Sequence, residues 1–358
     1  MRILDWRWWL GIRPQFATEP PKDYSISVVV PAYNEEKSIG NTVESIKKQT
    51  VAIARILVVD DSSQDATGDV ARSHGAEVIR TVTNQGTKAM AQNYVLPMVD
   101  TELMVTIDAD TILAPDAVEK TLPYFGDEKT ASVCGFVIPQ KVRTMWERGR
   151  FIEYLFGISV CKAGQNNFGA VLVSSGCFSV FRTEVLKSFG GFKARTMAED
   201  MDFTWEAQYN GYHVYCVQDA FCFPIDPSTA SVFISQVDRW CRSFFQNIAI
   251  HRFRMNKKLA IIIYGELLNS FASQIIFVIF LCLAKNLFSA LALGIVVDFL
   301  LIGIPCVIKG ARIGMLRATV LSLPFYFVVR LINQYIFWRS LWKEWIIRER
   351  LSTWNKGH

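Results

Sequence analysis

The chain has 358 residues and a formal net charge of +5, with 51% hydrophobic, 13% aromatic and only 20% charged residues. The apolar excess and the low charge exclude an ordinary, fully soluble protein and indicate association with a membrane. Because the charge is modest and no long Lys/Arg run is present, we expect no nucleic-acid partner.

Residues 1–22 form the first segment and contain three tryptophans among arginines. Charges at Asp5 and Arg7 interrupt this segment, so it is neither a signal peptide nor a membrane span. Tryptophan and arginine favour the headgroup level of a bilayer, and we therefore expect an N-terminal interfacial arm. The alternative is an arm that packs on protein or lies in solvent.

Residues 23–228 read as an α/β domain, because apolar runs of strand length alternate with helix-like stretches. This pattern predicts a mostly parallel sheet with helices on both faces and with ligands at the carboxyl ends of its strands. The expected strands cover residues 25–30, 56–60, 76–80, 102–107, 131–138, 176–181 and 212–217. The expected helices cover residues 35–48, 65–74, 86–98, 115–125, 145–163 and 199–210.

A second part of the chain is predicted to be membrane-bound and α-helical. An amphipathic helix is expected over 229–250, inside an interfacial segment 229–258, and a transmembrane region over 259–338 is followed by a basic, aromatic tail, 339–358. The apolar segments of the region cover residues 259–284, 287–308 and 318–338, each near or above the length that crosses a bilayer. The third contains Pro324, Arg330 and Asn333, so it crosses the membrane, is re-entrant or lies against protein.

Basic clusters flank these apolar segments at 251–258 and 309–317. By the positive-inside rule they predict a multi-pass protein of the plasma (inner) membrane whose α/β domain lies in the cytosol. Glu266, Asp298 and Arg330 fall within the apolar segments. They either line a passage for a polymer or lipid or form ion pairs between helices.

The most informative short motif is Asp108-Ala109-Asp110, which directly follows the apolar run that ends at Ile107. Two carboxylates at the end of a parallel strand repel each other unless a cation lies between them. Oxygen ligands of this kind suit Mg²⁺ or Mn²⁺, with a phosphate-bearing substrate completing the coordination. Taken alone, the motif is equally consistent with a turn followed by a helix N-cap.

Four further motifs accompany it in a fixed order. They are PAYNEE at 31–36, VDDSSQD at 59–65, Glu199-Asp200 and QVDRW at 236–240. With this ordered set the chain resembles the membrane-integrated family 2 glycosyltransferases of the processive type, which includes hyaluronan, chitin, poly-N-acetylglucosamine and cellulose synthases. The resemblance implies a GT-A fold, a Rossmann-like mostly parallel sheet, joined to interfacial and transmembrane helices.

The resemblance also implies a binding site for a UDP-sugar donor. The residues that it assigns to the donor are Ala32, Tyr33, Glu35, Asp60, Asp61, Lys88, Asp108, Ala109, Asp110, Gln236 and Arg239, with Asp108 and Asp110 as ligands of Mn²⁺ or Mg²⁺. Carboxylates accept from the N–H groups of a base, and an aromatic ring stacks on its face. The ammonium of Lys88 would offset phosphate charge. Thr87 is an extra residue relative to the usual motif of the family around this lysine. The alternative for Tyr33 and Asp61 is that they are only turn residues at the ends of strands.

The remaining implied roles concern the transfer step and the acceptor. Asp200 matches the family's catalytic base, which deprotonates the acceptor hydroxyl as it attacks the anomeric carbon from the face opposite UDP. Both acids at 199–200 read otherwise as helix caps. The residues assigned to a glycan or lipid acceptor are Glu199, Trp240, Gly176 and Cys177. Trp354 and Lys356 resemble a short element that closes over the donor, and they read equally well as a solvated tail.

The sequence thus predicts an inverting UDP-sugar transferase that builds or extends a β-linked, hexosamine-containing polysaccharide. Two alternatives stay open. One is a non-processive enzyme that moves a single sugar to a lipid or a surface glycan. The other is a nucleotide-sugar-binding scaffold without activity, which would be expected to have lost one of the acids.

Overall fold

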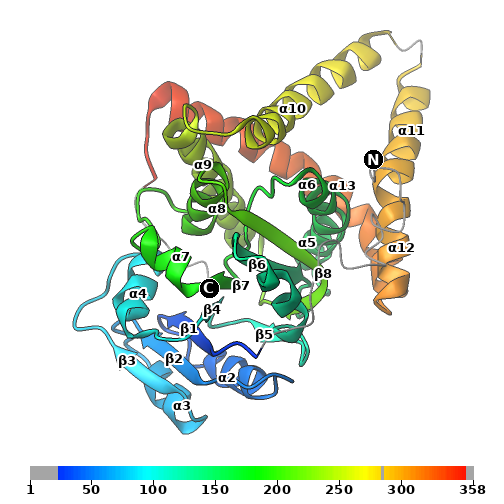
Figure 1. Cartoon of the computed structure of the whole chain (residues 1–358). Coiled ribbons are helices and arrows are strands. Elements are labelled where there is room, and N and C mark those ends of the chain that lie inside the picture. The colour runs from blue at the N-terminus through cyan, green and yellow to red at the C-terminus, as the bar shows by residue number, and fades with distance from the viewer. Residues whose placement is uncertain (1–22, 284–285, 352–358) are drawn as a thin grey trace.

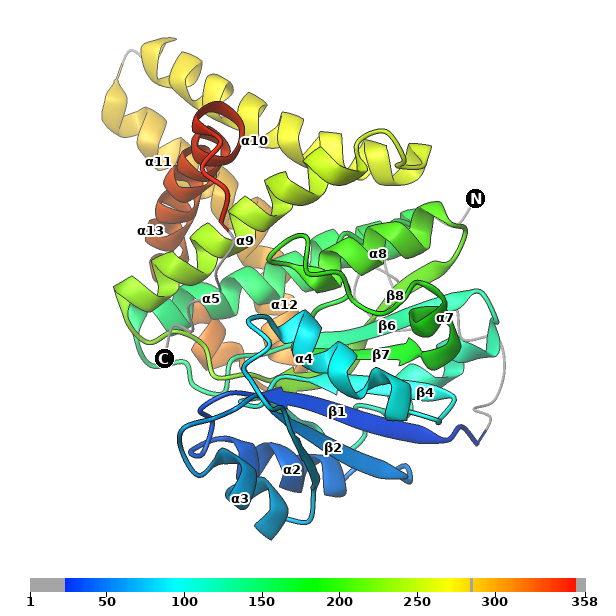
Figure 2. The same ribbon diagram turned by 90° about the vertical axis from the view of Figure 1, so that its left-hand side faces the viewer.

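A computed structural model describes residues 23–283 and 286–351, and its centre is one eight-stranded sheet (Figures 1 and 2). The strand order is β3-β2-β1-β4-β7-β6-β8-β5. β1, β2, β3 and β4 run parallel, β7 is antiparallel to β4 and β6, and β8 is parallel to β6 and antiparallel to β5. The bounds are Ile26–Ala32, Arg55–Asp60, Glu77–Arg80, Leu103–Ile107, Ile112–Leu113, Thr130–Val137, Phe178–Arg182 and His213–Phe223 for β1 to β8.

Helices cover both faces of the sheet, as the continuous apolar strands predict. In β4, Leu103 and Val105 point into one hydrophobic core while Met104 points into the other, because successive side chains alternate between the faces. One face packs on α2 (Ile39–Lys47), α3 (Thr67–Ser73), the 3₁₀ turn η2 (Glu119–Gly126) and α5 (Met145–Phe156). The other face packs on α4 (Lys88–Val95), α7 (Thr183–Ser188) and α8 (Glu199–Tyr209).

Several boundaries differ from those expected. In place of the helix expected over 115–125, a turn over 115–118 leads into the 3₁₀ turn η2, which contains Pro123. Residues 145–163 form α5, then a π-helical turn (Gly157–Lys162) that leads into α6 (Ala163–Phe168). β8 continues to Phe223 through a register shift opposite Gly135. A Cβ atom at that glycine would lie 2.4 Å from the Ala220 carbonyl oxygen, so only glycine allows the two strands to pass there.

The C-terminal part is helical and begins with α9 (Ala230–His251). It continues with α10 (Lys257–Leu283), α11 (Leu287–Asp298), a π-helical turn, α12 (Ile304–Arg312), α13 (Leu316–Leu341) and a last turn, η5 (Trp342–Ile347). α10 and α11 project away from the sheet, whereas α13 lies along α5 and α9 (Figures 1 and 2). Val329 of α13 packs with Phe233 and Val237 of α9 in one buried cluster.

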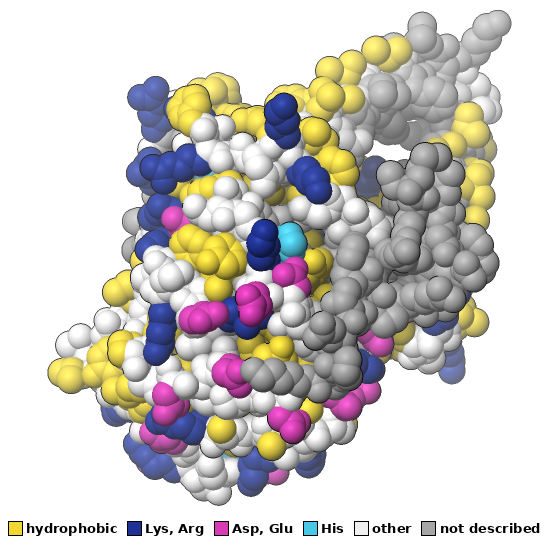
Figure 3. All heavy atoms as spheres, viewed as in Figure 1, with side chains coloured by type: hydrophobic (Ala, Val, Ile, Leu, Met, Phe, Trp, Pro, Cys, Tyr) yellow, Lys and Arg dark blue, Asp and Glu magenta, His cyan; other side chains and the backbone are white. Residues whose placement is uncertain are grey.

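Two helical segments of the described part are long and apolar enough to cross a membrane, Leu293–Arg312 and Leu316–Ile347. Large apolar side chains are exposed along α10, α11 and α13, and Figure 3 shows such side chains over α10, above the more charged surface of the α/β domain. The segment expected over 318–338 forms one continuous helix through Pro324, and Asn333 on it donates to Glu153 Oε2 of α5 (3.3 Å). The arm 1–22 and the side chain of Asp298 lie outside the described residues.

Candidate active site

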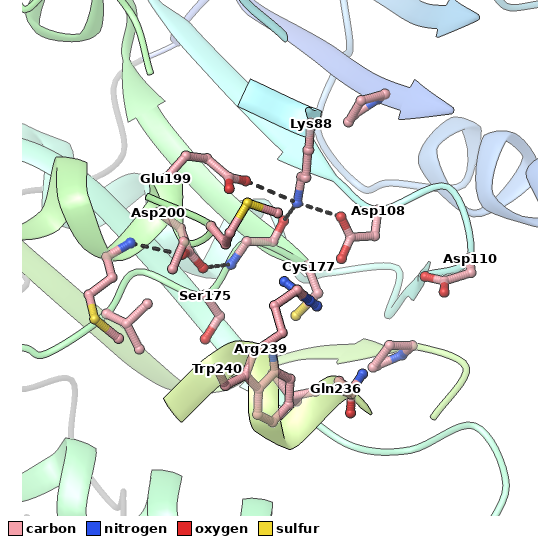
Figure 4. Close-up of a pocket in the computed structure, with 18 of the residues that line it drawn as sticks. Lys88, Asp108, Asp110, Ser175, Cys177, Glu199, Asp200, Gln236, Arg239 and Trp240 are labelled. Atoms are coloured by element: carbon pink, nitrogen blue, oxygen red, sulfur yellow. Dashed lines mark hydrogen bonds and ion pairs between the residues drawn. The ribbon is translucent and has the colours of Figure 1, made fainter. Parts of the chain in front are cut away.

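A cavity of about 980 Å³ opens at the carboxyl ends of β1 and β4, between the sheet, α8 and α9. Fifteen of the residues assigned from the sequence line it: Ala32, Tyr33, Glu35, Asp61, Lys88, Asp108, Ala109, Asp110, Gly176, Cys177, Glu199, Asp200, Gln236, Arg239 and Trp240. Figure 4 shows Lys88, Asp108, Asp200 and Arg239 around a common space. Acids separated by more than 90 positions in the chain therefore share one cleft.

One of the expected donor contacts, Asp60, is not part of this cavity. Asp60 is 1% exposed and does not line it. Its Oδ2 accepts from Arg80 (2.5 Å) and its Oδ1 accepts from the Ser63 amide (2.9 Å), so it fixes the loop after β2 instead of facing a ligand. The expectation that Asp60 contacts the donor is therefore not supported by its position. Trp354 and Lys356 lie beyond the described residues.

The loops after β1 and β2 interlock and so form one wall of the cavity. Asn34 and Ser62 adopt left-handed backbone conformations (φ 55° and 58°), which turn both loops sharply. The Asn34 amide donates to Ser63 Oγ (3.0 Å). Asp61 is 6% exposed, and its Oδ1 accepts from Thr81 Oγ1 and from the Gln85 amide (both 2.9 Å).

Lys88 is the central cation of the site and lies at the start of α4. Thr87, the insertion noted in the motif around Lys88, caps that helix by accepting from the Met90 amide. Lys88 Nζ donates to Asp108 Oδ1 (2.5 Å) and to the Gly176 carbonyl oxygen (2.7 Å), and lies 3.9 Å from Glu199 Oε1. Burial alone would lower the pKa of Lys88, but the neighbouring carboxylates outweigh it and raise the pKa, so the ammonium stays charged.

Asp108 and Asp110 follow β4 on a loop whose backbone is held at every carbonyl. The carbonyl oxygen of Asp108 accepts from the Thr111 amide (3.0 Å), that of Ala109 from Thr42 Oγ1 (2.9 Å) and that of Asp110 from Gln140 Nε2 (2.8 Å). The same Gln140 nitrogen donates to the Phe223 carbonyl oxygen of β8 (2.8 Å). The two carboxylates are therefore presented by a fixed turn.

The charge around this loop suits a divalent cation. Burial raises the pKa of Asp108, and the nearby charge of Asp110 raises it further, while Lys88 and Arg239 oppose the shift. Two hard oxygen donors that repel each other are the ligand type that Mg²⁺ and Mn²⁺ prefer. Across the described part of the chain no three acidic, His or Cys side chains gather as a ligand set for a metal ion.

Asp200 lies in the first turn of α8 and is held by two amides. Its Oδ2 accepts from the Gly176 amide and its Oδ1 from the Met201 amide (both 2.8 Å). A Cβ atom at Gly176 would lie 3.0 Å from both Asp200 Oδ2 and Lys88 Nζ, so the absence of a side chain lets the acid and the ammonium approach the same loop. Burial raises the pKa of the adjacent Glu199 to about 7.

A network of hydrogen bonds around the buried Asp202 fixes α8 relative to α9. Asp202 accepts from Arg195 at both carboxylate oxygens (2.9 and 2.7 Å), and its Oδ1 lies 2.6 Å from His251 Nε2 at the end of α9. Asp202 and His251 are both fully buried. The helix that carries Asp200 is therefore anchored to the helix that carries Gln236, Arg239 and Trp240.

The sequence analysis missed several residues on the opposite wall of the cavity. Lys162, in the π-helical turn, donates to Ser175 Oγ (2.6 Å), and Tyr154 donates to Asp226 Oδ1 (3.1 Å). Burial raises the pKa of Asp226 to about 7. Their one signal in the sequence is the amphipathic stretch 145–163, which predicts a covered helix but not which face meets the cavity.

Comparisons with known proteins identify the family of the chain. Residues 20–243 match the family model described as "Glycosyltransferase like family 2". The chain is 29% identical to hyaluronan synthase of Streptococcus pyogenes over 252 residues, which is 64% of this chain and 59% of that protein. It is 25% identical to poly-beta-1,6-N-acetyl-D-glucosamine synthase of Staphylococcus epidermidis over 222 residues, 61% of this chain and 54% of that protein.

The chain thus spans less than two thirds of the length of these curated relatives. Its fold is similar to that of a mannosyltransferase from Pyrobaculum calidifontis, solved in complex with GDP-Man and Mn²⁺. The TM-score is 0.64 at 18% identity, and the match covers 90% of this chain and 93% of that one.

Proposed function

The chain belongs to glycosyltransferase family 2, and from this premise we propose that it is an inverting, UDP-sugar-dependent transferase that extends a β-linked, hexosamine-containing glycan at a membrane. The observation that carries the proposal is the convergence of Lys88, Asp108, Asp110, Asp200 and Arg239 on one cavity. Its hexosamine preference is supported by the similarity to a hyaluronan synthase and a poly-N-acetylglucosamine synthase.

Asp200 is the proposed general base. Two backbone amides hold its carboxylate, and neither contact requires a proton on the acid, so it can accept one from the acceptor hydroxyl. The hydroxyl oxygen then forms a bond to the anomeric carbon as the bond to the UDP oxygen breaks. Attack from the opposite face inverts the configuration at that carbon.

The departing diphosphate needs positive charge, which Lys88 and Arg239 supply from opposite walls. Lys88 comes from α4 and Arg239 from α9, and Figure 4 shows both side chains near Asp108. A guanidinium can bind two phosphate oxygens at once, whereas an ammonium acts as a compact charge. Asp108 and Asp110 are the residues that would hold Mn²⁺ or Mg²⁺, whose charge stabilises the leaving diphosphate when bound.

The remaining wall residues fit the base and the acceptor. Tyr33, Glu35 and Asp61 lie on the loops after β1 and β2, where a uracil and ribose would be held. Trp240 on α9, with Gly176, Cys177 and Glu199, faces the acceptor side. We place the α/β domain, residues 23–228, in the cytosol and the C-terminal helices in the plasma (inner) membrane.

A nucleotide-release assay on the purified full chain tests this proposal. UDP release should occur with one member of a panel of UDP-sugars, stop with EDTA, and resume with Mn²⁺ or Mg²⁺. Mass spectrometry of the product then separates chain extension from the transfer of a single sugar to a lipid or glycan. UDP binding without release from any UDP-sugar would contradict the proposal and favour a binding scaffold.

A further inference from the structure

Arg150 of α5 is a fully buried charge that none of the sequence motifs includes. Its guanidinium carbon lies 4.4 Å from the ring centroid of Trp240 and 4.4 Å from that of Phe233. Both rings belong to α9. A planar cation in contact with two aromatic rings is attracted to each, and most strongly to the indole.

The hydrogen bonds of Arg150 reach the same helix. Its Nη2 donates to Gln236 Oε1 (2.9 Å), and its Nη1 donates to Glu153 Oε2 on α5 (2.8 Å). Gln236 and Trp240 are four residues apart, so they lie on one side of α9. Arg150 therefore contacts two of the three residues of the Gln-x-x-Arg-Trp motif, while Arg239 between them extends toward the donor side (Figure 4).

Arg150 also links α9 to the membrane helices and to the cavity wall. Glu153, its partner, accepts from Asn333 of α13 (3.3 Å) and lines the cavity. Asp226 lies 3.7 Å from Arg150 Nε on the other side and lines the cavity as well. Arg150 and its partner Glu153 thus join α5, α9 and α13 beside the cavity wall.

A cation that is fully buried is a weak source of stability, because its loss of hydration cancels much of the attraction to its partners. The guanidinium instead fixes geometry. Because it is planar and forked, it sets the plane of the Trp240 indole and the direction of the Gln236 side-chain amide. We propose that Arg150 is a positioning residue for sugar transfer, which holds the indole of Trp240 in the orientation that seats the acceptor and is itself oriented by its hydrogen bond to Gln236. This inference rests on the proposed function.

Kinetics of three variants of the full chain test the proposal. Arg150→Met keeps the volume but removes the charge, and Arg150→Lys keeps the charge but removes the planar fork. Arg148→Met is the matched control. Arg148 lies on the same helix, 5.5 Å from the ring of Phe325, and contacts α13 but not the cavity. The readouts are KM and kcat for acceptor and donor separately, the binding of UDP with Mn²⁺, and the melting temperature.

Misplacement of reacting groups by about 1 Å can lower a rate by ~100-fold, so for Arg150→Met we expect the acceptor KM to rise and kcat to fall by ~10-fold each. The donor KM and the affinity for UDP should change less, by no more than ~threefold, because the donor loses only the orientation of Gln236 and keeps Lys88 and Arg239. Arg150→Lys should keep both the melting temperature of the unmodified chain and the raised acceptor KM of Arg150→Met, because an ammonium can pair with Glu153 and Asp226 but cannot fix the plane of the indole. Arg148→Met should match the unmodified chain.

Two results would overturn the inference: an unchanged acceptor KM in Arg150→Lys, or equal losses for donor and acceptor in Arg150→Met. If Arg150→Met does not fold, Arg150→Lys decides alone. Failure of the proposed function gives a different result, because the unmodified chain and Arg148→Met would then both release no UDP.

Discussion

At the residue scale, Asp200 and Lys88 are both hydrogen-bonded to the backbone of one glycine, Gly176. Gly176 donates its amide to Asp200 and offers its carbonyl oxygen to Lys88, so the two side chains are positioned by the same peptide segment. The local sequence Ser-Gly-Cys gives no sign of this arrangement, since both partners lie far away in the chain. The acids themselves were predictable because each directly follows a strand or begins a helix.

The first prediction concerns the proposed base. Asp200→Asn keeps an acceptor for the Gly176 amide but removes the basic oxygen, so UDP release to an acceptor should fall ~100-fold or more. The affinity for UDP with Mn²⁺, measured by calorimetry, should change little. Asp69→Asn is the control, because Asp69 also lies in the first turn of a helix but is exposed and far from the cavity. Equal rates for Asp200→Asn and the control would remove Asp200 from its role.

The second prediction concerns Glu199, whose pKa burial raises from 4.5 to about 7. The folded chain therefore holds more protons at Glu199 than the unfolded chain does between these values, and this contribution to the free energy of unfolding falls as the pH rises. Glu199→Gln mimics the protonated acid, so the variant does not lose this part of its free energy of unfolding as the pH rises. Its melting temperature relative to the unmodified chain should increase with pH across this window, and a constant difference would contradict the raised pKa.

At the scale of elements, close packing of α5 on α13 brings the C-terminal helices to the cavity wall. Gly149 permits this contact, because a Cβ atom there would lie 2.4 Å from Val329 Cγ2. Small residues at helix interfaces have this effect generally. Arg150 is the next residue, so the packing also sets the distance from its guanidinium to α9.

The third prediction follows from this contact. Gly149→Ala should lower the free energy of unfolding by about 1–3 kcal/mol, since the new methyl group forces α13 to shift. Gly265→Ala in α10 is the matched control, because nothing lies within 4 Å of a Cβ atom there. The control should be neutral or slightly stabilising, as alanine favours helix more than glycine does. Denaturation of both variants in detergent measures the difference, and equal stabilities would show that α13 is not packed this closely.

Elements differed in how well the sequence predicted them. The parallel strands were found because each is a continuous apolar run between helix-like stretches. The second half of β8 was missed because Gln218 and Asp219 interrupt its apolar pattern, and the strand continues only through its bulged pairing with β6. The contact of Arg150 with Gln236 joins residues 86 positions apart, which no local pattern encodes.

At the scale of the whole molecule, the sheet and the C-terminal helices form one connected body. Cys306 of α12 and Tyr326 of α13 belong to the same hydrophobic core as β1 and β4. Lys309 of α12 donates to the Gln218 carbonyl oxygen of β8 (2.9 Å). The composition predicted membrane attachment, but not that the apolar C-terminal helices share the core of the α/β domain.

The fourth prediction concerns this attachment. The exposed apolar faces of α10, α11 and α13 should keep the chain in the membrane fraction through washes with high salt and alkaline carbonate, because burial in lipid is insensitive to charge screening. Mild detergent should release it with UDP-sugar activity retained. Release by salt alone would show that the chain is held only by surface charge.

The turn that presents Asp108 and Asp110 has a thermodynamic consequence. Its three consecutive peptide oxygens are engaged by Thr111, Thr42 and Gln140, so little backbone motion remains there to be lost when an ion arrives. The conformational entropy of this loop is already lost when the chain folds, before any ion binds. If Asp108 and Asp110 bind a divalent ion as proposed, Gln140 should therefore strengthen that binding without contacting the ion, because it holds the loop that carries both carboxylates in one conformation.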